Sequence, residues 1–116
     1  GQGSLFHVSY SGVTMALLHG GQPDALILAH EPTRNHMRGL PGYDLPSLEE
    51  LRDTALPLAR VSNPACQVVG VSVNTQHLSD DEALSYLAEV EARMGIPAVD
   101  PFRQGAARLV DALATL

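Results

Sequence analysis

Three short apolar runs, separated by segments with the start and stop signals of helices, constrain the fold of this chain more than any other feature. The runs are DALILAH (Asp24–His30), QVVGVSVN (Gln67–Asn74) and IPAVD (Ile96–Asp100), and each has the length and aliphatic composition of a buried strand. Strands that alternate with helices are joined by right-handed crossovers in a parallel sheet. We therefore expect an α/β fold with a three-layer open parallel sheet, in which residues 1–116 belong to one domain.

Local signals predict where the two central helices begin and end. A serine followed three residues later by a glutamate is a capping box, and this pattern predicts helices that begin after Ser47 and after Ser79. Pro57 lies inside the first helix and is expected to kink or end it near Leu56, because proline lacks the amide hydrogen that a helix interior uses. Gly95 is expected to end the second helix.

Three further segments complete the predicted organisation. Ser11 is expected to cap a short helix over Gly12–His19, which the following glycine pair ends. Asp100 and Pro101 are expected to cap and start one last helix. The segment between the first strand and Pro46 is rich in proline and glycine, so we expect a long loop there.

Net charge and hydropathy exclude two classes of partner. The chain has 13 acidic and 7 basic residues, which gives a formal net charge of −6. Nucleic-acid binding relies on clustered cations and on aromatic side chains, which make up only 4% of the residues, so we expect no nucleic-acid partner. The longest uninterrupted apolar run has five residues, far fewer than the roughly 20 that cross a membrane. We therefore expect no membrane partner.

Lysine and cysteine usage narrows the possible chemistry. All seven basic residues are arginines, so the chain itself offers no Walker-type phosphate lysine and no Schiff-base lysine. Cys66 is the single cysteine, which excludes a disulfide within the chain and fits a reducing compartment, so we expect a cytoplasmic location. We expect Cys66 itself to be a small buried apolar residue.

The segment HEPTRNHMRG, directly after the first predicted strand, is a candidate anion-binding loop. In an open parallel sheet, ligands bind beyond the carboxyl ends of the strands. Arg34 and Arg38 lie four residues apart in this segment, and guanidinium groups make paired hydrogen bonds to phosphate or carboxylate. The alternative is that both are solvated loop arginines.

The same segment supplies the candidate catalytic residues His30, His36 and Glu31. A histidine at this edge of the sheet can act as a general base, although His30 can equally be a core histidine with satisfied hydrogen bonds. The order H-E-x-x-x-x-H on a proline-containing loop does not match the helical H-E-x-x-H of zinc proteases, so we expect no metal site.

Two other segments offer polar groups to the same crevice. The opening loop GQGSLF and the residues just after it offer an anion backbone amides together with side-chain hydroxyls and other donors. The candidate anion-binding residues here are Gln2, Ser4, His7, Tyr10 and Ser11. An ordinary turn is the alternative. Asn74 ends the valine-rich strand, where its amide is able to bind a base edge or carbonyl, or to close an Asx turn.

Four stretches together resemble a known bacterial family of unknown function, whose members are often labelled putative NAD-dependent epimerase/dehydratase proteins. The stretches are GQGSL-x-H-x-x-YSGVT, PDALILAHEP-x-R-x-HMRG, VGVSVNT and GIPAVDP, and the resemblance covers nearly the whole chain. Val8 departs from the family pattern, which has proline there.

The resemblance implies that this chain is the C-terminal portion of a P-loop NTPase-like domain, similar to dethiobiotin synthetase. A Rossmann-like domain and the phosphate loop would precede it, which agrees with the opening glycine-rich loop having no strand before it. By the same resemblance, Asn74 matches the position that recognises adenine, and the GQGS loop lies beside the nucleotide phosphates.

Some members of the family are similar to D-glutamate N-acetyltransferases, which implies acetyl transfer from acetyl-CoA to an acidic D-amino acid. Acetyl-CoA or ATP would then be the cofactor of the full-length protein, and its partner would be an anionic small molecule. The full-length protein would form a homo-oligomer. ATP-dependent phosphoryl transfer or ligation on a carboxylate is an alternative reaction. A non-catalytic ligand-binding or assembly module is the third interpretation, and we expect no turnover by residues 1–116 alone.

Overall fold

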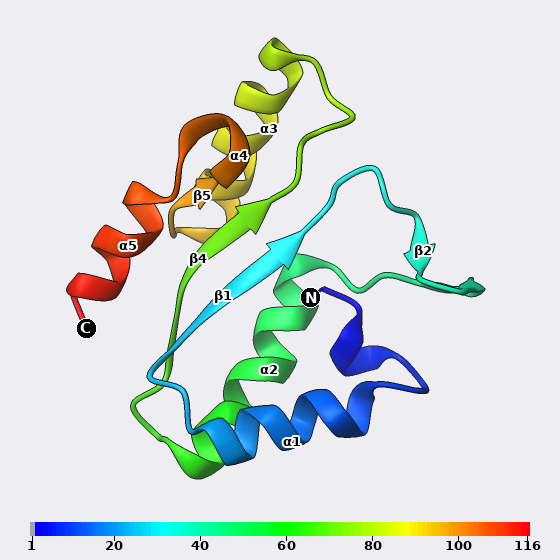
Figure 1. The fold of residues 1–116 in the computed structure, drawn as a ribbon, viewed down its shortest axis with the longest axis vertical. Coiled ribbons are helices and arrows are strands. Elements are labelled where there is room, and N and C mark those ends of the chain that lie inside the picture. Colours follow the sequence, from blue (N-terminus) through cyan, green and yellow to red (C-terminus); the bar gives the residue numbers. More distant parts are fainter. Residues whose placement is uncertain (1) are drawn as a thin grey trace.

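Three parallel strands form the central sheet of the structure, a computed structural model that describes residues 2–116 (Figure 1). Their spatial order is β1-β4-β5, and each strand pairs in parallel with its neighbour; they are β1 (Ala25–His30), β4 (Gln67–Val73) and β5 (Ala98–Val99). The pairing aligns His30 with Val73, so the carboxyl ends of β1 and β4 meet at one edge. The predicted α/β fold with a parallel sheet is confirmed.

Helices surround the sheet and fill the connections between the strands (Figure 1). The α-helices are α1 (Ser11–Gly21), α2 (Leu48–Ser62), α3 (Asp80–Met94), α4 (Pro101–Gln104) and α5 (Ala107–Ala114). A short 3-10 helix, η1 (Ser4–Phe6), precedes α1. Both predicted serine caps are present: Ser47 accepts a hydrogen bond from the Glu50 amide, and Ser79 with Glu82 forms a complete capping box.

The two faces of β4 contact different helices, which gives the three-layer arrangement. Val71 and Val73 belong to the main core cluster together with Leu51 of α2 and Leu87 of α3. On the opposite face, a side chain at Gly70 would collide with Leu109 of α5. Strand residues alternate between faces, so α2 and α3 cover one side of the sheet and α5 covers the other.

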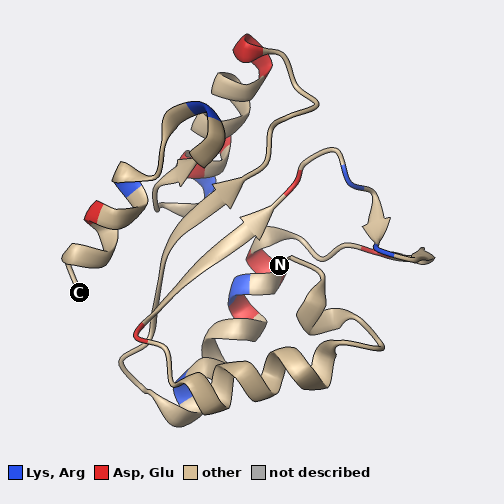
Figure 2. Cartoon of the chain, viewed as in Figure 1, with Lys and Arg blue, Asp and Glu red and all other residues tan. Residues whose placement is uncertain are grey.

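Helix α1 packs on α2 and carries no charged residue, as Figure 2 shows by its uniform tan colour. Its residues Met15 and Leu18 lie against the main core, whereas Val13 and Leu17 are exposed. Ser11 is the first residue of α1 rather than its cap, because its hydroxyl donates a hydrogen bond to the Leu5 carbonyl instead of accepting one from the helix.

The predicted long loop before Pro46 is wrong in part, because it contains a small antiparallel hairpin. Strands β2 (His36–Met37) and β3 (Leu40–Asp44) pair across a turn at Gly39, which has a φ of 74°. Glycine adopts this left-handed conformation without the steric cost that a side chain would add. The hairpin projects away from the sheet edge (Figure 1).

The expected break at Pro57 is also wrong, since α2 continues past it to Ser62. Pro57 is exposed, and the carbonyl that its missing amide leaves unbonded lies on the solvent side of the helix. Leu51, Ala55 and Ala59 are buried on the opposite face, so tertiary packing holds the helix together through the proline.

The single last helix that we expected is divided in two. Asp100 caps α4 and Pro101 is its first residue, as predicted, but α4 ends at Gly105 with a φ of 75° and α5 begins at Ala107. The left-handed glycine redirects the chain so that Leu109 reaches the sheet at Gly70.

Candidate functional site

A cavity of about 830 Å³ lies at the carboxyl edge of the sheet. Its walls come from the ends of all three central strands, from the opening segment and from α4. The lining residues that sequence analysis singled out are Gln2, His30, Glu31, Arg34 and Asn74. A cavity of this size accommodates a small organic ligand.

His30 is linked to two distant parts of the chain. Its Nδ1 lies 2.7 Å from Oε1 of Gln2, and its Nε2 contacts the hydroxyl of Tyr86 on α3. Burial lowers the pKa of His30, nearby Arg93 lowers it further, and Glu31 opposes both effects. These effects favour the neutral imidazole, and both ring nitrogens are in contact with protein groups.

Glu31 and Arg34 form a charged pair within the cavity wall. Arg34 Nε lies 3.5 Å from Glu31 Oε2, and the Thr33 hydroxyl donates to Glu31 Oε1 at 2.6 Å. The side chain of Arg34 is 49% exposed while that of Glu31 is 19% exposed. The guanidinium group therefore keeps donors available for an anionic ligand beside a partly buried carboxylate.

Asn74 follows β4, and the structure shows the Asx turn that was one of the two interpretations of its position. Its Oδ1 accepts a hydrogen bond from the Gln76 amide at 3.1 Å, which closes an Asx turn. Its side chain also lines the cavity, with the amide nitrogen as the group left to donate to a ligand.

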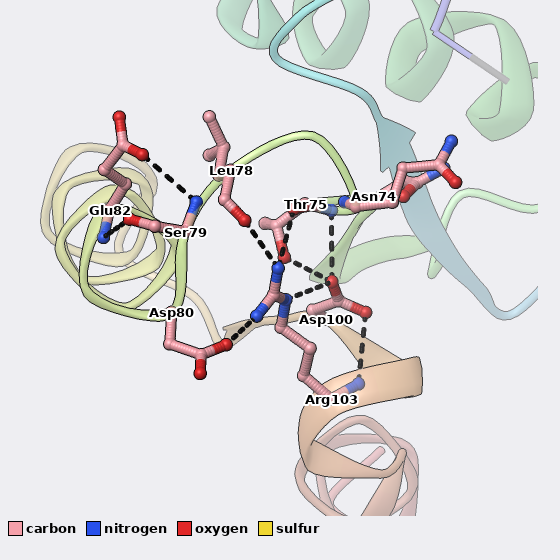
Figure 3. A network of polar contacts seen from close by, with 9 residues as sticks. Asn74, Thr75, Leu78, Ser79, Asp80, Glu82, Asp100 and Arg103 are labelled. Carbon is pink, nitrogen blue, oxygen red and sulfur yellow. Dashed lines mark hydrogen bonds and ion pairs between the residues drawn. The ribbon is translucent and has the colours of Figure 1, made fainter.

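The third wall of the cavity is braced by a buried polar network, shown in Figure 3. Asp100 accepts hydrogen bonds from the backbone amide and hydroxyl of Thr75 and from the amides of Phe102 and Arg103 at the start of α4. Burial alone would raise the pKa of Asp100, but these hydrogen bonds outweigh it and hold the pKa below its usual value.

Arg103 extends this network to the segment between β4 and α3. Its guanidinium group donates to the carbonyls of Thr75 and Leu78 at 3.1 and 2.7 Å and pairs with Asp80 (Figure 3). The turn that carries Asn74 is thereby tied to α4, so the two walls of the cavity keep a defined separation.

The remaining predicted site residues lie outside the cavity wall, contrary to the single shared crevice that we expected. His36 and Arg38 are exposed in the hairpin, and neither lines the cavity. Ser4 lies in η1, and Tyr10 is exposed with its ring 4.6 Å from that of His7. Their functional roles stay predictions.

His7 and Ser11 make structural contacts in this same region. His7 is buried, accepts the Ser9 amide at Nδ1 and donates from Nε2 to the Arg38 carbonyl at 3.2 Å. These bonds fasten the opening segment to the hairpin. Together with the Ser11 bond to Leu5, they account for the polar atoms of both side chains without a ligand.

Sequence reasoning missed several residues of the cavity wall. They are Ser72, Gln76, Asp100, Phe102 and Arg103, besides Tyr86 behind His30. Asp100 and Pro101 were expected to follow the third strand at this edge and to start a helix, but neither was named as a site residue. Their position directly after a strand was the sequence signal that could have identified Asp100, Phe102 and Arg103 as site residues. No local sequence feature indicates that Tyr86 lies near the site.

Two features are absent from the described residues 2–116, a metal-binding cluster and a membrane-spanning helix. No cluster of three or more histidine, cysteine, aspartate or glutamate side chains in this range is arranged to hold a metal ion. No helix within the same range is long and apolar enough to cross a membrane. Cys66 is buried, as predicted, and burial raises the pKa of its thiol.

An α/β domain with a parallel sheet and a cavity at the carboxyl edge of that sheet is the class that the structure defines. The model of one family, the P-loop domain of DUF1611 (DUF1611_C), a domain of unknown function, matches residues 1–110. This chain therefore belongs to the DUF1611 family, which confirms the resemblance seen in the sequence motifs.

Two curated relatives carry the same name. A D-glutamate N-acetyltransferase of Tritonibacter scottomollicae is 77% identical over 116 residues, which is 100% of this chain and 35% of the relative. A D-glutamate N-acetyltransferase of Pseudoalteromonas sp. is 43% identical over 110 residues, 95% of this chain and 33% of the relative. The chain thus spans about a third of the length of these relatives.

A solved structure of the same family has the same fold. The crystal structure of a DUF1611 family protein from Anabaena variabilis ATCC 29413 is similar, with a TM-score of 0.88 and 34% sequence identity. The similarity covers 100% of this chain and 34% of the crystallised one.

Proposed function

We propose that this chain forms part of the substrate site of a D-glutamate N-acetyltransferase, which transfers the acetyl group of acetyl-CoA to the amino group of an acidic D-amino acid. The observation that carries the proposal is the 77% identity, over the whole chain, to a protein of that name. The chain spans 35% of that relative, so the activity belongs to the full-length protein.

The charges in the cavity support an acceptor that has both an amino group and carboxylates. Arg34 offers a guanidinium group to a carboxylate, and Glu31 beside it offers a carboxylate to the ammonium group. Asn74 lines the same cavity from the end of the neighbouring strand β4, where its amide suits the nucleotide portion of acetyl-CoA.

The reaction needs an acceptor for one proton. The amine nitrogen attacks the thioester carbon, a C–N bond forms, the C–S bond breaks, and CoA leaves as the thiol after taking up a proton. Glu31 is the proposed proton acceptor of the amine, because both nitrogens of His30 already contact protein groups and His36 lies in the exposed hairpin.

The full-length protein tests this proposal directly. Acetyl-CoA and D-glutamate are supplied together and separately, and the released thiol is measured with a thiol-reactive dye. Thiol release that requires both substrates supports the proposal, and release without dependence on the acceptor contradicts it.

Arg34→Gln in the full-length protein is expected to raise the KM for D-glutamate at least tenfold, since a hydrogen bond from a charged donor contributes about 1.5–3 kcal/mol. Arg52→Gln is the matched control, because Arg52 lies on α2 and pairs only with Asp53. Steady-state kinetics with varied D-glutamate measure the effect. An unchanged KM in the Arg34 variant would remove Arg34 from the substrate site.

A second candidate function follows from the description of the family as a P-loop domain. Such domains bind nucleotide phosphates, which favours ATP-dependent phosphoryl transfer or ligation on a carboxylate. Release of phosphate from ATP that depends on a carboxylate substrate, without thiol release from acetyl-CoA, would select this function. Binding of either nucleotide without any turnover would select a ligand-binding module instead.

A further inference from the structure

One chain of hydrogen bonds crosses the base of the candidate site. It runs from the Pro46 carbonyl to Gln2, from Gln2 to His30 and from His30 to Tyr86. His30 is separated by 28 residues from Gln2 and by 56 residues from Tyr86. This series of hydrogen bonds therefore joins the opening segment, the end of β1, the start of α2 and the middle of α3.

The Pro46 carbonyl, at one end of this series of hydrogen bonds, determines which atom carries the proton in each bond. A carbonyl oxygen only accepts, so the Gln2 amide must turn its nitrogen toward Pro46, at 2.7 Å. The amide oxygen then faces His30 Nδ1, which must carry a proton to form the 2.7 Å bond. Nε2 of the neutral ring is left as an acceptor, and the Tyr86 hydroxyl donates to it.

The surrounding charges agree with this assignment. Burial and the positive charge of Arg93 lower the pKa of His30, against the opposing effect of Glu31. Burial also raises the pKa of Tyr86, although Arg93 opposes it, so the phenol keeps the proton that it donates. Glu49 and Glu89 on α2 and α3 hold Arg93, at 2.7 and 3.6 Å.

We propose that Tyr86 is a positioning residue of the candidate site, which fixes His30 as a neutral imidazole protonated at Nδ1 and through it holds Gln2 at the cavity wall. His30 is then the link between Tyr86 and Gln2 rather than the proton acceptor of the reaction. The kinetic test of this assignment rests on the proposed function, whereas its spectroscopic test does not.

The variant His30→Gln distinguishes a positioning role of His30 from a role as the general base. The glutamine amide has a donor nitrogen and an acceptor oxygen, as the neutral imidazole has a donor and an acceptor nitrogen, but it does not take up a proton at neutral pH. In the full-length protein we expect His30→Gln to lower kcat/KM about threefold and His30→Ala to lower it roughly tenfold or more. A general base at His30 would make both variants lose about 100-fold or more.

Tyr86→Phe removes only the hydroxyl group and is expected to lower kcat/KM about tenfold through misplacement of Gln2. The double variant with His30→Ala should have nearly the same kcat/KM as His30→Ala alone, because both changes break the same series of hydrogen bonds. Tyr43→Phe is the matched control, since Tyr43 is exposed on β3 and forms none of these hydrogen bonds. A fully additive double variant would overturn the proposal.

The protonation state of His30 is measured without any substrate. In full-length protein with ¹⁵N-labelled histidine, one imidazole should show a protonated Nδ1 and an unprotonated Nε2 at neutral pH, and this signal should be absent from His30→Gln protein. Tyr86→Phe should change that signal and Tyr43→Phe should not. A His30 protonated at Nε2 or at both nitrogens would overturn the proposal even if the protein proves to have another activity.

Discussion

The Asp100 carboxylate holds two segments of the cavity wall together, the turn after β4 and the start of α4. It is 4% exposed, accepts bonds from Thr75 and from the first amides of α4, and lies 3.7 Å from the Arg103 guanidinium group. An ionised carboxylate is tolerated at this depth because every part of it meets a donor.

Asp100→Asn is expected to lower the Tm of the full-length protein by several degrees at pH 7, because hydrogen bonds to a charged acceptor contribute about 1.5–3 kcal/mol. The folded-state pKa of Asp100 is depressed, so its contribution is present above the unfolded pKa of about 3.9 and is lost as pH falls through the folded value. The difference in Tm between the two proteins should narrow below about pH 4.

Thermal unfolding monitored by circular dichroism between pH 7 and pH 3 measures this effect. Asp111→Asn is the control, since Asp111 is exposed on α5. A Tm difference that stays constant over the whole range would contradict the assignment of a depressed pKa to Asp100.

At the level of single elements, the helix starts follow from short-range chemistry. Ser79 accepts from the Glu82 amide at 3.2 Å, and the Glu82 carboxylate accepts from the Ser79 amide at 3.1 Å. These bonds lower the pKa of Glu82 and join residues only three apart, so the sequence pattern was sufficient to predict them. Pro57 was misjudged because the packing of α2 outweighs one missing bond.

Ser79→Ala is expected to destabilise the protein by about 1 kcal/mol, since alanine cannot accept the hydrogen bond from the Glu82 amide in the first turn of α3. Ser85→Ala, an exposed change in the interior of the same helix, should leave stability unchanged or raise it slightly, because alanine is the better helix former. Denaturant unfolding of the two variants makes the comparison. Equal losses in both would show that the cap contributes nothing of its own.

At the scale of the whole molecule, the close approach of α5 to the sheet depends on a glycine. A Cβ at Gly70 would overlap Leu109 and lie 3.3 Å from the Pro97 carbonyl oxygen. The sequence VVGVSV indicated a strand without showing that its glycine makes room for a helix about 40 residues later, so the layer on this face of the sheet was not predictable in detail.

Gly70→Ala should therefore destabilise the molecule by about 1–3 kcal/mol through overpacking. Gly42→Ala is the control, because a Cβ at Gly42 meets nothing within 4 Å. The free energy of unfolding of each variant decides the matter, and a neutral Gly70 variant would mean that α5 shifts freely on the sheet.

Apolar periodicity, caps and turn residues by themselves determined the three central strands, most helix starts and the parallel sheet, because these depend on neighbours a few residues apart. The sequence also placed His30, Glu31, Arg34 and Asn74 at one edge, since parallel strands bring their carboxyl ends together. Only the tertiary structure decided that the hairpin carries His36 and Arg38 away from the cavity. It alone set the proton position on His30 as well, because the groups that impose it, Gln2 and Tyr86, are distant in the chain and become its neighbours only on folding.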